Sequence, residues 1–228
     1  MSTTRKAARV AGLLYVLMSI PGVWGLIYVP SKLIVSGDPA ATAHNILGAE
    51  TLFCSGIVAN LLGMAGFVWV ALALYDLLKR VHQMTALLMV IWISISVPIV
   101  FVAEAHHLDI LTILDPNGPA AALSDTGRLA MMSLSLRAYT NCILVSEIFW
   151  GLWLIPMGIL FYRSGFLPRF LGVLLFLAAA GYLIECVSLL SPAYGKAAQG
   201  IAAPLRALEL IIPLWLLILG AKEQPLPD

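Results

Sequence analysis

Long apolar runs are the feature of this sequence that most limits its possible folds. A helix that crosses a bilayer needs about 20 mostly apolar residues, at about 1.5 Å of rise per residue, and six runs meet this length. They occupy residues 10–30, 51–76, 84–104, 138–163, 168–190 and 201–221. We therefore predict an all-α, polytopic membrane protein: a single integral membrane domain over residues 1–228, built as a bundle of six transmembrane helices.

Composition excludes the common soluble classes. Hydrophobic residues make up 61% of the chain and charged residues only 11%, which is outside the usage of ordinary soluble domains. The net charge of +1 gives no basic excess for nucleic acid, and the sequence has no Gly-rich phosphate loop, HExxH or CxxC motif. We expect membrane lipids and a lipophilic small molecule as partners, no nucleic acid and no cofactor. A homodimer is a further candidate assembly.

The basic residues predict the orientation in the membrane. With the amino terminus in the cytoplasm, eight Lys and Arg residues lie on the cytoplasmic side and five lie outside or at the outer end of a span. This bias follows the positive-inside rule. The first run has no A-x-A cleavage site, so we interpret it as a retained helix. We expect a bacterial plasma membrane protein with both termini in the cytoplasm.

Three local signals predict irregular structure. Pro21 removes one backbone hydrogen bond and should kink the first span. Asp38 should cap a short helix that begins at Pro39. The long connection between residues 104 and 138 contains apolar residues and good helix formers, and we expect a partly helical outer loop that acts as a lid or interfacial helix. Ser124, Asp125 and Thr126 are candidate caps where this loop enters the fourth span.

Four stretches carry a resemblance to a known family. They are RVAGLLYVL, SGDPAATAHNILGAETLF, ALALYDLLK and the run from Tyr162 to Gly172, YRSGFLPRFLG, which is the most specific of the four. Over the region from about Arg9 to about Ser188 the chain resembles the bacterial multi-pass family catalogued as domain of unknown function 4386. The resemblance implies a fold of six helices and implies no activity.

Ionisable residues inside three spans define the candidate site. Glu147, Glu185 and Arg206 each lie 16 residues from a basic residue at the cytoplasmic end of the same span, which is about 24 Å from the inner surface in a helix. Charged groups in lipid face the bundle interior and pair there. We therefore expect the three side chains to converge at one level in the outer half of the membrane.

Acids outnumber bases in this layer. Glu209 shares a helical face with Arg206 and lies one turn deeper, so three carboxyl groups face one guanidinium. Because a low dielectric disfavours the charged form, we expect one acid to keep its proton at neutral pH. Arg206 could instead pair with Glu209 or Glu147 while the other acids anchor the outer interface. We assign Glu147, Glu185, Glu209 and Arg206 to catalysis.

Aromatic and polar side chains near these acids are candidates for substrate binding. Aromatic faces stabilise a passing cation, although aromatic stripes more often only pack helices together. The predicted binding residues are Phe149, Trp150, Trp153, Tyr182, Asn60, Glu50 and Glu104.

A second polar group is a weak candidate for metal binding. Glu104 and His107 form an E-x-x-H pair on one helical face, with His106 beside them. Carboxylate-bridged di-metal bundles need two such pairs, and the sequence has one. We therefore predict no metal site and interpret these histidines as residues of the outer interface.

Three functions are compatible with these residues. The first is an integral membrane enzyme whose buried carboxylates perform acid/base chemistry on a lipid-soluble, isoprenoid-like substrate, such as terpene cyclisation or isomerisation. The second is a proton-coupled small-molecule transporter or exporter, in which the same carboxylates carry protons. The third is a non-catalytic membrane partner protein. Aromatic residues next to the acids favour the enzyme.

Overall fold

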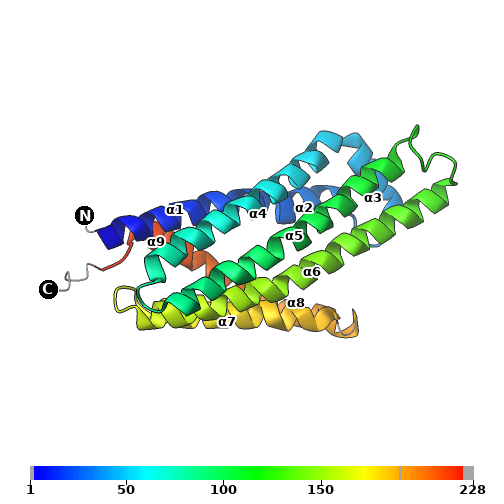
Figure 1. Cartoon of the computed structure of the whole chain (residues 1–228). Helices are drawn as coiled ribbons and strands as arrows, with labels where there is room; N and C mark the ends of the chain where they lie inside the picture. Colours follow the sequence, from blue (N-terminus) through cyan, green and yellow to red (C-terminus); the bar gives the residue numbers. More distant parts are fainter. Residues whose placement is uncertain (1–2, 190–191, 223–228) are drawn as a thin grey trace. The chain divides into compact units, whose positions relative to one another are not determined.

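The chain is all-helical in the computed structural model, which describes residues 3–189 and 192–222. No β-strand occurs within these ranges. Figure 1 shows the helices in chain order. They are α1 (Thr3–Val23), the π-helix η1 (Trp24–Tyr28), α2 (Val29–Leu33), α3 (Pro39–Gly48), α4 (Glu50–Leu78), α5 (Gln83–Leu114), α6 (Asp125–Arg163), α7 (Arg169–Glu185), the 3-10 helix η2 (Cys186–Leu189), α8 (Pro192–Ala207), the 3-10 helix η3 (Leu208–Leu210) and α9 (Ile211–Ile218).

Five helical segments of the described chain are long and apolar enough to cross a membrane. They are Thr4–Leu33, Glu50–Leu78, Gln83–Leu114, Asp125–Arg163 and Ala197–Ile218. The multi-pass helical character predicted from the apolar runs is therefore confirmed. Helix α7 has 17 residues and is shorter than these five. Leu190, the last residue of the predicted span 168–190, lies outside the described residues, as do both ends of the chain.

The distribution of polar and apolar side chains also indicates a membrane protein. The large apolar side chains of Leu62, Trp69 and Leu134 are 64%, 67% and 68% exposed, whereas Glu104 and Glu147 are 1% and 5% exposed. Water would disfavour a surface of this kind. A lipid environment favours it, because charged groups in lipid are driven inward to find partners.

The connection between residues 104 and 138 corrects the expectation of a separate lid helix. Helix α5 continues to Leu114 and α6 begins at Asp125, so most of the predicted outer loop prolongs the two spans. Extending an existing helix requires no new nucleus, and the Leu, Ile, Ala and Met residues of this segment are compatible with helix. Of the three candidate caps, Ser124 caps α6, because the Gly127 N–H donates to Ser124 Oγ at 3.2 Å.

A π-helix follows Pro21 in the first span. Val29 N–H donates to Trp24 O, five residues earlier, and the α-helical pattern resumes at α2. Proline leaves a gap in the backbone ladder because it has no N–H. Inserted π turns of this kind occur frequently at functional sites.

The predicted cap at the start of α3 is confirmed. Asp38 Oδ1 accepts a hydrogen bond from Ala41 N–H at 2.9 Å, and Pro39 occupies the first helical position.

Asp38→Ala should destabilise α3 by about 1 kcal/mol, because the Ala41 N–H loses its side-chain acceptor. Hydrogen exchange of the α3 amides should then be about five-fold faster than in the wild type if the helix opens locally. Asp38→Asn retains an acceptor oxygen and is the control. Equal exchange rates in the two variants would contradict a capping role for Asp38.

Contacts between Cα atoms divide the chain into two compact units. Unit 1 draws on Met1–Met18, Ala65–Val97 and Leu144–Asp228, and unit 2 draws on Ser19–Met64 and Pro98–Ile143. Helices α1, α4, α5 and α6 therefore each contribute residues to both units. The single domain expected from the sequence stays a prediction.

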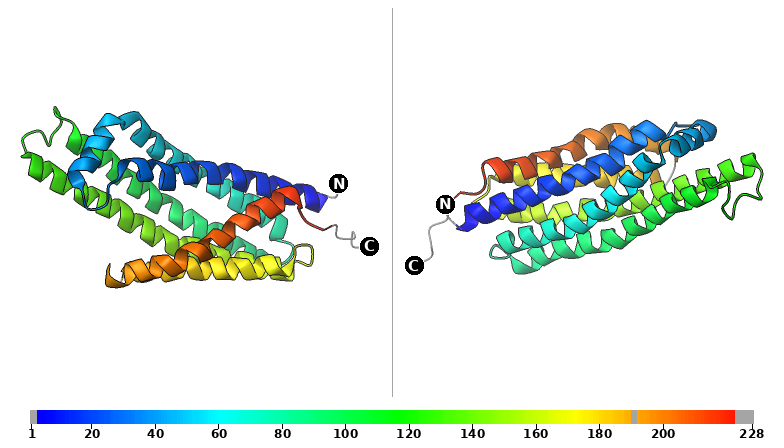
Figure 2. Two further views of the ribbon diagram at one scale, coloured as in Figure 1. Left: turned by 180° about the vertical axis from the view of Figure 1, so that it is seen from behind. Right: turned by 90° about the horizontal axis from the view of Figure 1, so that it is seen from above.

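Unit 1 is held together by close helix packing. Helices α7 and α8 lie side by side, and Figure 2 shows α9 beside the first half of α1. A Cβ atom at Gly12 would lie only 2.4 Å from Leu217 N, so only glycine permits this approach of α1 to the last helix.

Unit 2 has its own apolar core. It consists of Val29, Leu33, Ala43, Ile46, Phe53, Ile57, Ile110, Ile113, Leu114, Ala120 and Met132.

Candidate functional site

Helices α6, α7 and α8 bring the three ionisable residues of the predicted layer together in unit 1. Arg206 Nη1 donates to Glu147 Oε1 at 2.7 Å, and Arg206 Nη2 lies 2.7 Å from Glu185 Oε2. The second contact is an ion pair without the alignment of a hydrogen bond. The convergence predicted from equal depth is therefore present, and one guanidinium contacts two carboxyl groups.

The local sequence explains how Arg206 reaches both acids. Gly181 lies one turn before Glu185 on α7, and a Cβ atom there would meet Ala202 O and Arg206 N of α8 at 3.0 Å. The absence of a side chain lets the two backbones approach closely. Arg206 is then near enough to Glu185 to pair with it while its long side chain also extends to α6.

Charge at this cluster is unbalanced. The side chains of Glu147 and Glu185 are 7% and 6% exposed, and that of Arg206 is 26% exposed. Glu147 Oε2 and Trp150 Nε1, three positions apart on α6, are each buried and have no hydrogen-bond partner among the described residues. A buried polar atom without a hydrogen-bond partner is rare in a packed interior. Each atom marks a place where a proton or a bound molecule would complete the hydrogen bonding.

Glu209 is held by two tyrosines. The 3-10 helix η3 carries Glu209, which is 9% exposed. Tyr182 O–H donates to Glu209 Oε2 at 2.9 Å, and Tyr15 O–H donates to Glu209 Oε1. The Arg206 guanidinium lies 5.6 Å from the centre of the Tyr182 ring. Tyr182 therefore connects Glu209 to the Glu147–Arg206–Glu185 group.

Tyr15 is a site residue that the sequence reasoning missed. It lies in the middle of the first apolar run and is 3% exposed. A tyrosine in such a position usually needs a hydrogen-bond partner for its hydroxyl. Its place within an apolar run was therefore the sequence signal that could have identified it as a site residue.

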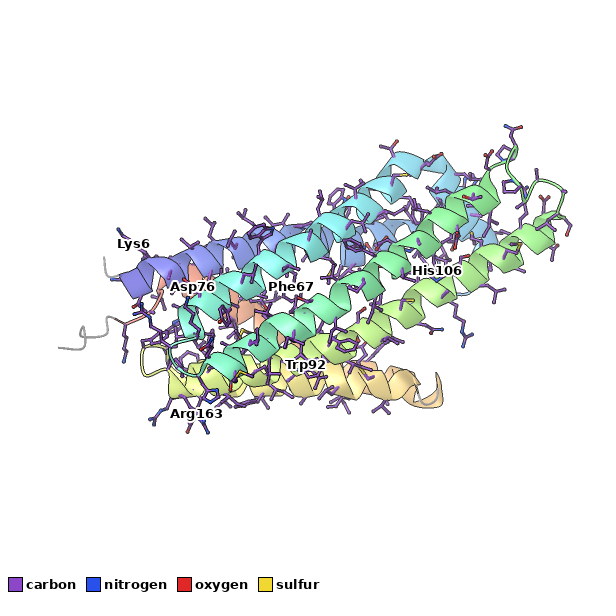
Figure 3. The ribbon with its side chains drawn as sticks, viewed as in Figure 1. Lys6, Phe67, Asp76, Trp92, His106 and Arg163 are labelled. Carbon is purple, nitrogen blue, oxygen red and sulfur yellow. The ribbon has the colours of Figure 1, made fainter. Side chains whose placement is uncertain are left out.

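The predicted aromatic residues have different surroundings. The Trp150 ring contacts Tyr182 edge-on at 6.2 Å between centroids. Trp153 is fully buried and packs against Phe67, and Phe149 packs against Trp92 at 6.1 Å. Figure 3 labels Phe67 on α4 and Trp92 on α5. Trp150 thus packs against a tyrosine that binds Glu209, and substrate binding by all three aromatic residues stays a prediction.

Unit 2 contains a second buried polar group. Asn60 Nδ2 donates to Glu104 Oε1 at 2.7 Å, and His107 Nδ1 lies 3.0 Å from Glu104 Oε2. Tyr139 O–H is 3.5 Å from Asn60 Nδ2. The sequence associated Asn60 with the layer of Glu147, but its hydrogen bonds are made here.

The remaining predicted residues lie at helix ends or on the surface. Glu50 is exposed at the first position of α4. His106 Nδ1 pairs with Asp109 Oδ2 at 3.2 Å on the exposed side of α5. Within residues 3–189 and 192–222, no three His, Cys, Asp or Glu residues are grouped so that they could hold a metal ion.

Comparison with known proteins identifies a family and no function. An uncharacterized protein of Archaeoglobus fulgidus is 34% identical to this chain over 87 residues, which are 38% of this chain and 51% of that protein. The chain thus spans about half the length of this curated relative. No solved structure matches the chain significantly. The sequence profile of the family described as Domain of unknown function (DUF4386) matches residues 10–220. The chain belongs to this family.

Proposed function

We propose that this protein is an integral membrane enzyme that performs acid/base chemistry on a lipid-soluble, isoprenoid-like substrate, such as cyclisation or isomerisation of a terpene. The observation that supports this most directly is the contact of one guanidinium with two buried carboxyl groups. Keeping both acids ionised with one cation would leave a buried charge uncompensated, which is costly. One of the two carboxyl groups therefore keeps a proton that it can donate.

The proposed reaction uses only groups of this chain. Glu147 transfers its proton to a carbon of a substrate double bond, and the π electrons form the new C–H bond and leave a carbocation. The Trp150 face stabilises that cation, and Arg206 stabilises the new carboxylate. Glu147 or Glu185 then removes a proton from a neighbouring carbon, and this C–H electron pair forms the shifted double bond. Proton and electrons balance without an oxidant or reductant.

We also propose that the chain crosses the membrane six times. Helix α7 and the following η2 provide 17 and 4 helical residues in direct succession, which is about the length of a spanning segment. With α7 as the sixth span, the distribution of basic residues supports a bacterial plasma membrane protein with both termini in the cytoplasm. The acid cluster then lies in the outer half of the bilayer.

Glu147→Gln should abolish turnover, because the amide cannot donate the proton. We expect the rate of product formation from a polyprenyl lipid extract to fall about 10²-fold or more, measured with the purified protein by mass spectrometry of the products. Asp76→Asn is the matched control, since Asp76 is an exposed acid of unit 1 paired only with Lys79 in the described contacts. Full turnover in a folded Glu147→Gln protein would contradict the proposal.

Proton-coupled transport is the second candidate function, and the last span favours it. The helix changes from α to 3-10 at Leu208–Leu210, the segment that carries Glu209, and Pro204 and Pro213 lie on either side. Discontinuous helices form the binding sites of many transporters, and six spans per chain would require a dimer.

Sealed vesicles distinguish the two functions. If the protein is a transporter, Glu147→Gln and Glu185→Gln should abolish pH-driven uptake and leave the composition of the lipid extract unchanged. If the protein is the enzyme, the same two variants should form less product from the lipid extract even in detergent, where no pH gradient exists. If both variants fold and neither uptake nor product formation differs from the wild type, the result would support a non-catalytic membrane partner.

A further inference from the structure

Unit 2 contains a small pocket with one polar side chain in an apolar wall. It opens between η1, α2, α4 and α5, near His106, which Figure 3 labels on α5. The space inside accommodates about one water-sized group. The lining residues are Gly25, Val29, Pro30, Leu33, Ile34, Phe53, Gly56, Ile57 and His107.

Two glycines bring the first span and α4 close together beside the pocket. A Cβ atom at Gly25 would lie 2.2 Å from Asn60 Oδ1 and 2.7 Å from Gly56 O. A Cβ atom at Gly56 would lie 3.0 Å from Val29 Cγ1. The backbone of Gly25 in the π-helix therefore packs directly against Asn60. Asn60 donates a hydrogen bond to Glu104.

His107 is fixed on three sides. Its Nδ1 contacts Glu104 Oε2 at 3.0 Å, its ring stacks on Tyr139 with centroids 3.7 Å apart, and Phe53 lies 5.0 Å away. Glu104 already accepts a hydrogen bond from Asn60. A carboxylate in this position accepts the proton of Nδ1–H, and this hydrogen bond fixes the tautomer of the ring.

His107 lines the pocket, and its other ring nitrogen has no partner among the described residues. His107 is 4% exposed, and its Nε2 is buried with no hydrogen-bond partner among the described residues. Leaving a buried polar atom unsatisfied costs more than a hydrogen bond usually gains. With the proton on Nδ1, Nε2 presents a lone pair and can accept a hydrogen bond from a ligand.

We propose that this pocket binds the hydroxyl group of a lipophilic alcohol, whose O–H donates to His107 Nε2. The available space fits a hydroxyl group and no more, so the hydrocarbon chain of the ligand would extend out of the pocket past its apolar wall. A single neutral acceptor in an apolar wall selects a neutral ligand with one donor. This site is built entirely from unit 2 and does not depend on the proposed function of unit 1.

Nuclear magnetic resonance of the full-length protein in nanodiscs, with ¹⁵N-labelled histidine, tests the proposal directly. Decanol should shift the resonance of His107 Nε2, because its O–H donates to that nitrogen. Decyl methyl ether has the same chain but no donor and should leave the resonance unchanged. His106, which is paired with Asp109 on the exposed side of α5, should respond to neither compound. Equal shifts with both compounds, or none with decanol, would overturn the proposal.

Binding of radiolabelled decanol provides a second readout. His107→Phe keeps an aromatic ring against Tyr139 but removes the acceptor, and it should weaken binding about ten-fold, the usual effect of one buried hydrogen bond. Gly56→Ala narrows the pocket beside Val29 without touching the Glu104–His107 pair, and it should weaken binding as well. His106→Phe is the control. Unchanged affinity in both folded pocket variants would show that decanol binds elsewhere.

Discussion

Arg206→Gln should lower the free energy of unfolding by about 3–5 kcal/mol, because it leaves two buried carboxyl groups without their cation. The side chains of Glu147 and Glu185 are 7% and 6% exposed, so water cannot replace the guanidinium. The loss is measured by titrating the protein with SDS in mixed micelles and following the loss of helix. Arg206→Lys keeps the charge but not the two-pronged geometry, and its loss should be smaller.

A triple variant separates the charge effect from a packing effect. Adding Glu147→Gln and Glu185→Gln to Arg206→Gln removes the carboxyl groups that were left without their cation, and most of the lost stability should return. Replacing an ion pair completely usually costs far less than breaking it on one side. A triple variant as unstable as Arg206→Gln alone would show that Arg206 acts mainly through packing and not through the two acids.

Trp153→Ala should lower the free energy of unfolding by about 3–5 kcal/mol, because it opens a large cavity in the core of unit 1. The Trp153 ring is 0% exposed and contacts Phe67 at 4.9 Å and Tyr15 at 5.9 Å between centroids. The same SDS titration measures the change. Trp69→Ala is the control, since Trp69 is 67% exposed and its removal leaves no cavity.

Trp153→Phe determines whether the residue has a second role. Trp153 Nε1 has no hydrogen-bond partner in the described structure, so phenylalanine loses ring volume and no polar contact, and the cost should be well below that of alanine. If Trp153 only packs, turnover of the polyprenyl extract should persist in the folded Phe variant. A folded Phe variant without turnover would instead support the predicted contact between Trp153 and substrate.

The convergence of the three ionisable residues was predictable because a helix has a constant rise. Equal spacing from a basic end therefore means equal depth, and Glu147, Glu185 and Arg206 meet as this spacing predicted. The rotation of each helix was not predictable, since it depends on which faces pack together. This is why Tyr15 was missed as a partner of Glu209, and why Asn60 was expected near the acid layer rather than beside Glu104.

Helix ends were less predictable than helix cores. Charged and polar residues such as Glu104 and Arg137 show where an apolar run stops, but a helix can continue past them when its backbone hydrogen bonds remain favourable. Helix α5 continues for ten residues beyond Glu104, to Leu114. The sequence signals that did locate ends were side-chain caps: Asp38 before α3 and Ser124 before α6.

The division into two units has a consequence for how the protein is made. Every segment of unit 2 lies before residue 144, whereas unit 1 needs Leu144–Asp228 to join segments translated much earlier. Because the chain leaves the ribosome from its amino end, the His107 pocket has all its residues while Glu185, Arg206 and Glu209 have still to be synthesised. Until then Glu147 must enter the bilayer without its arginine, either protonated or shielded by the insertion machinery.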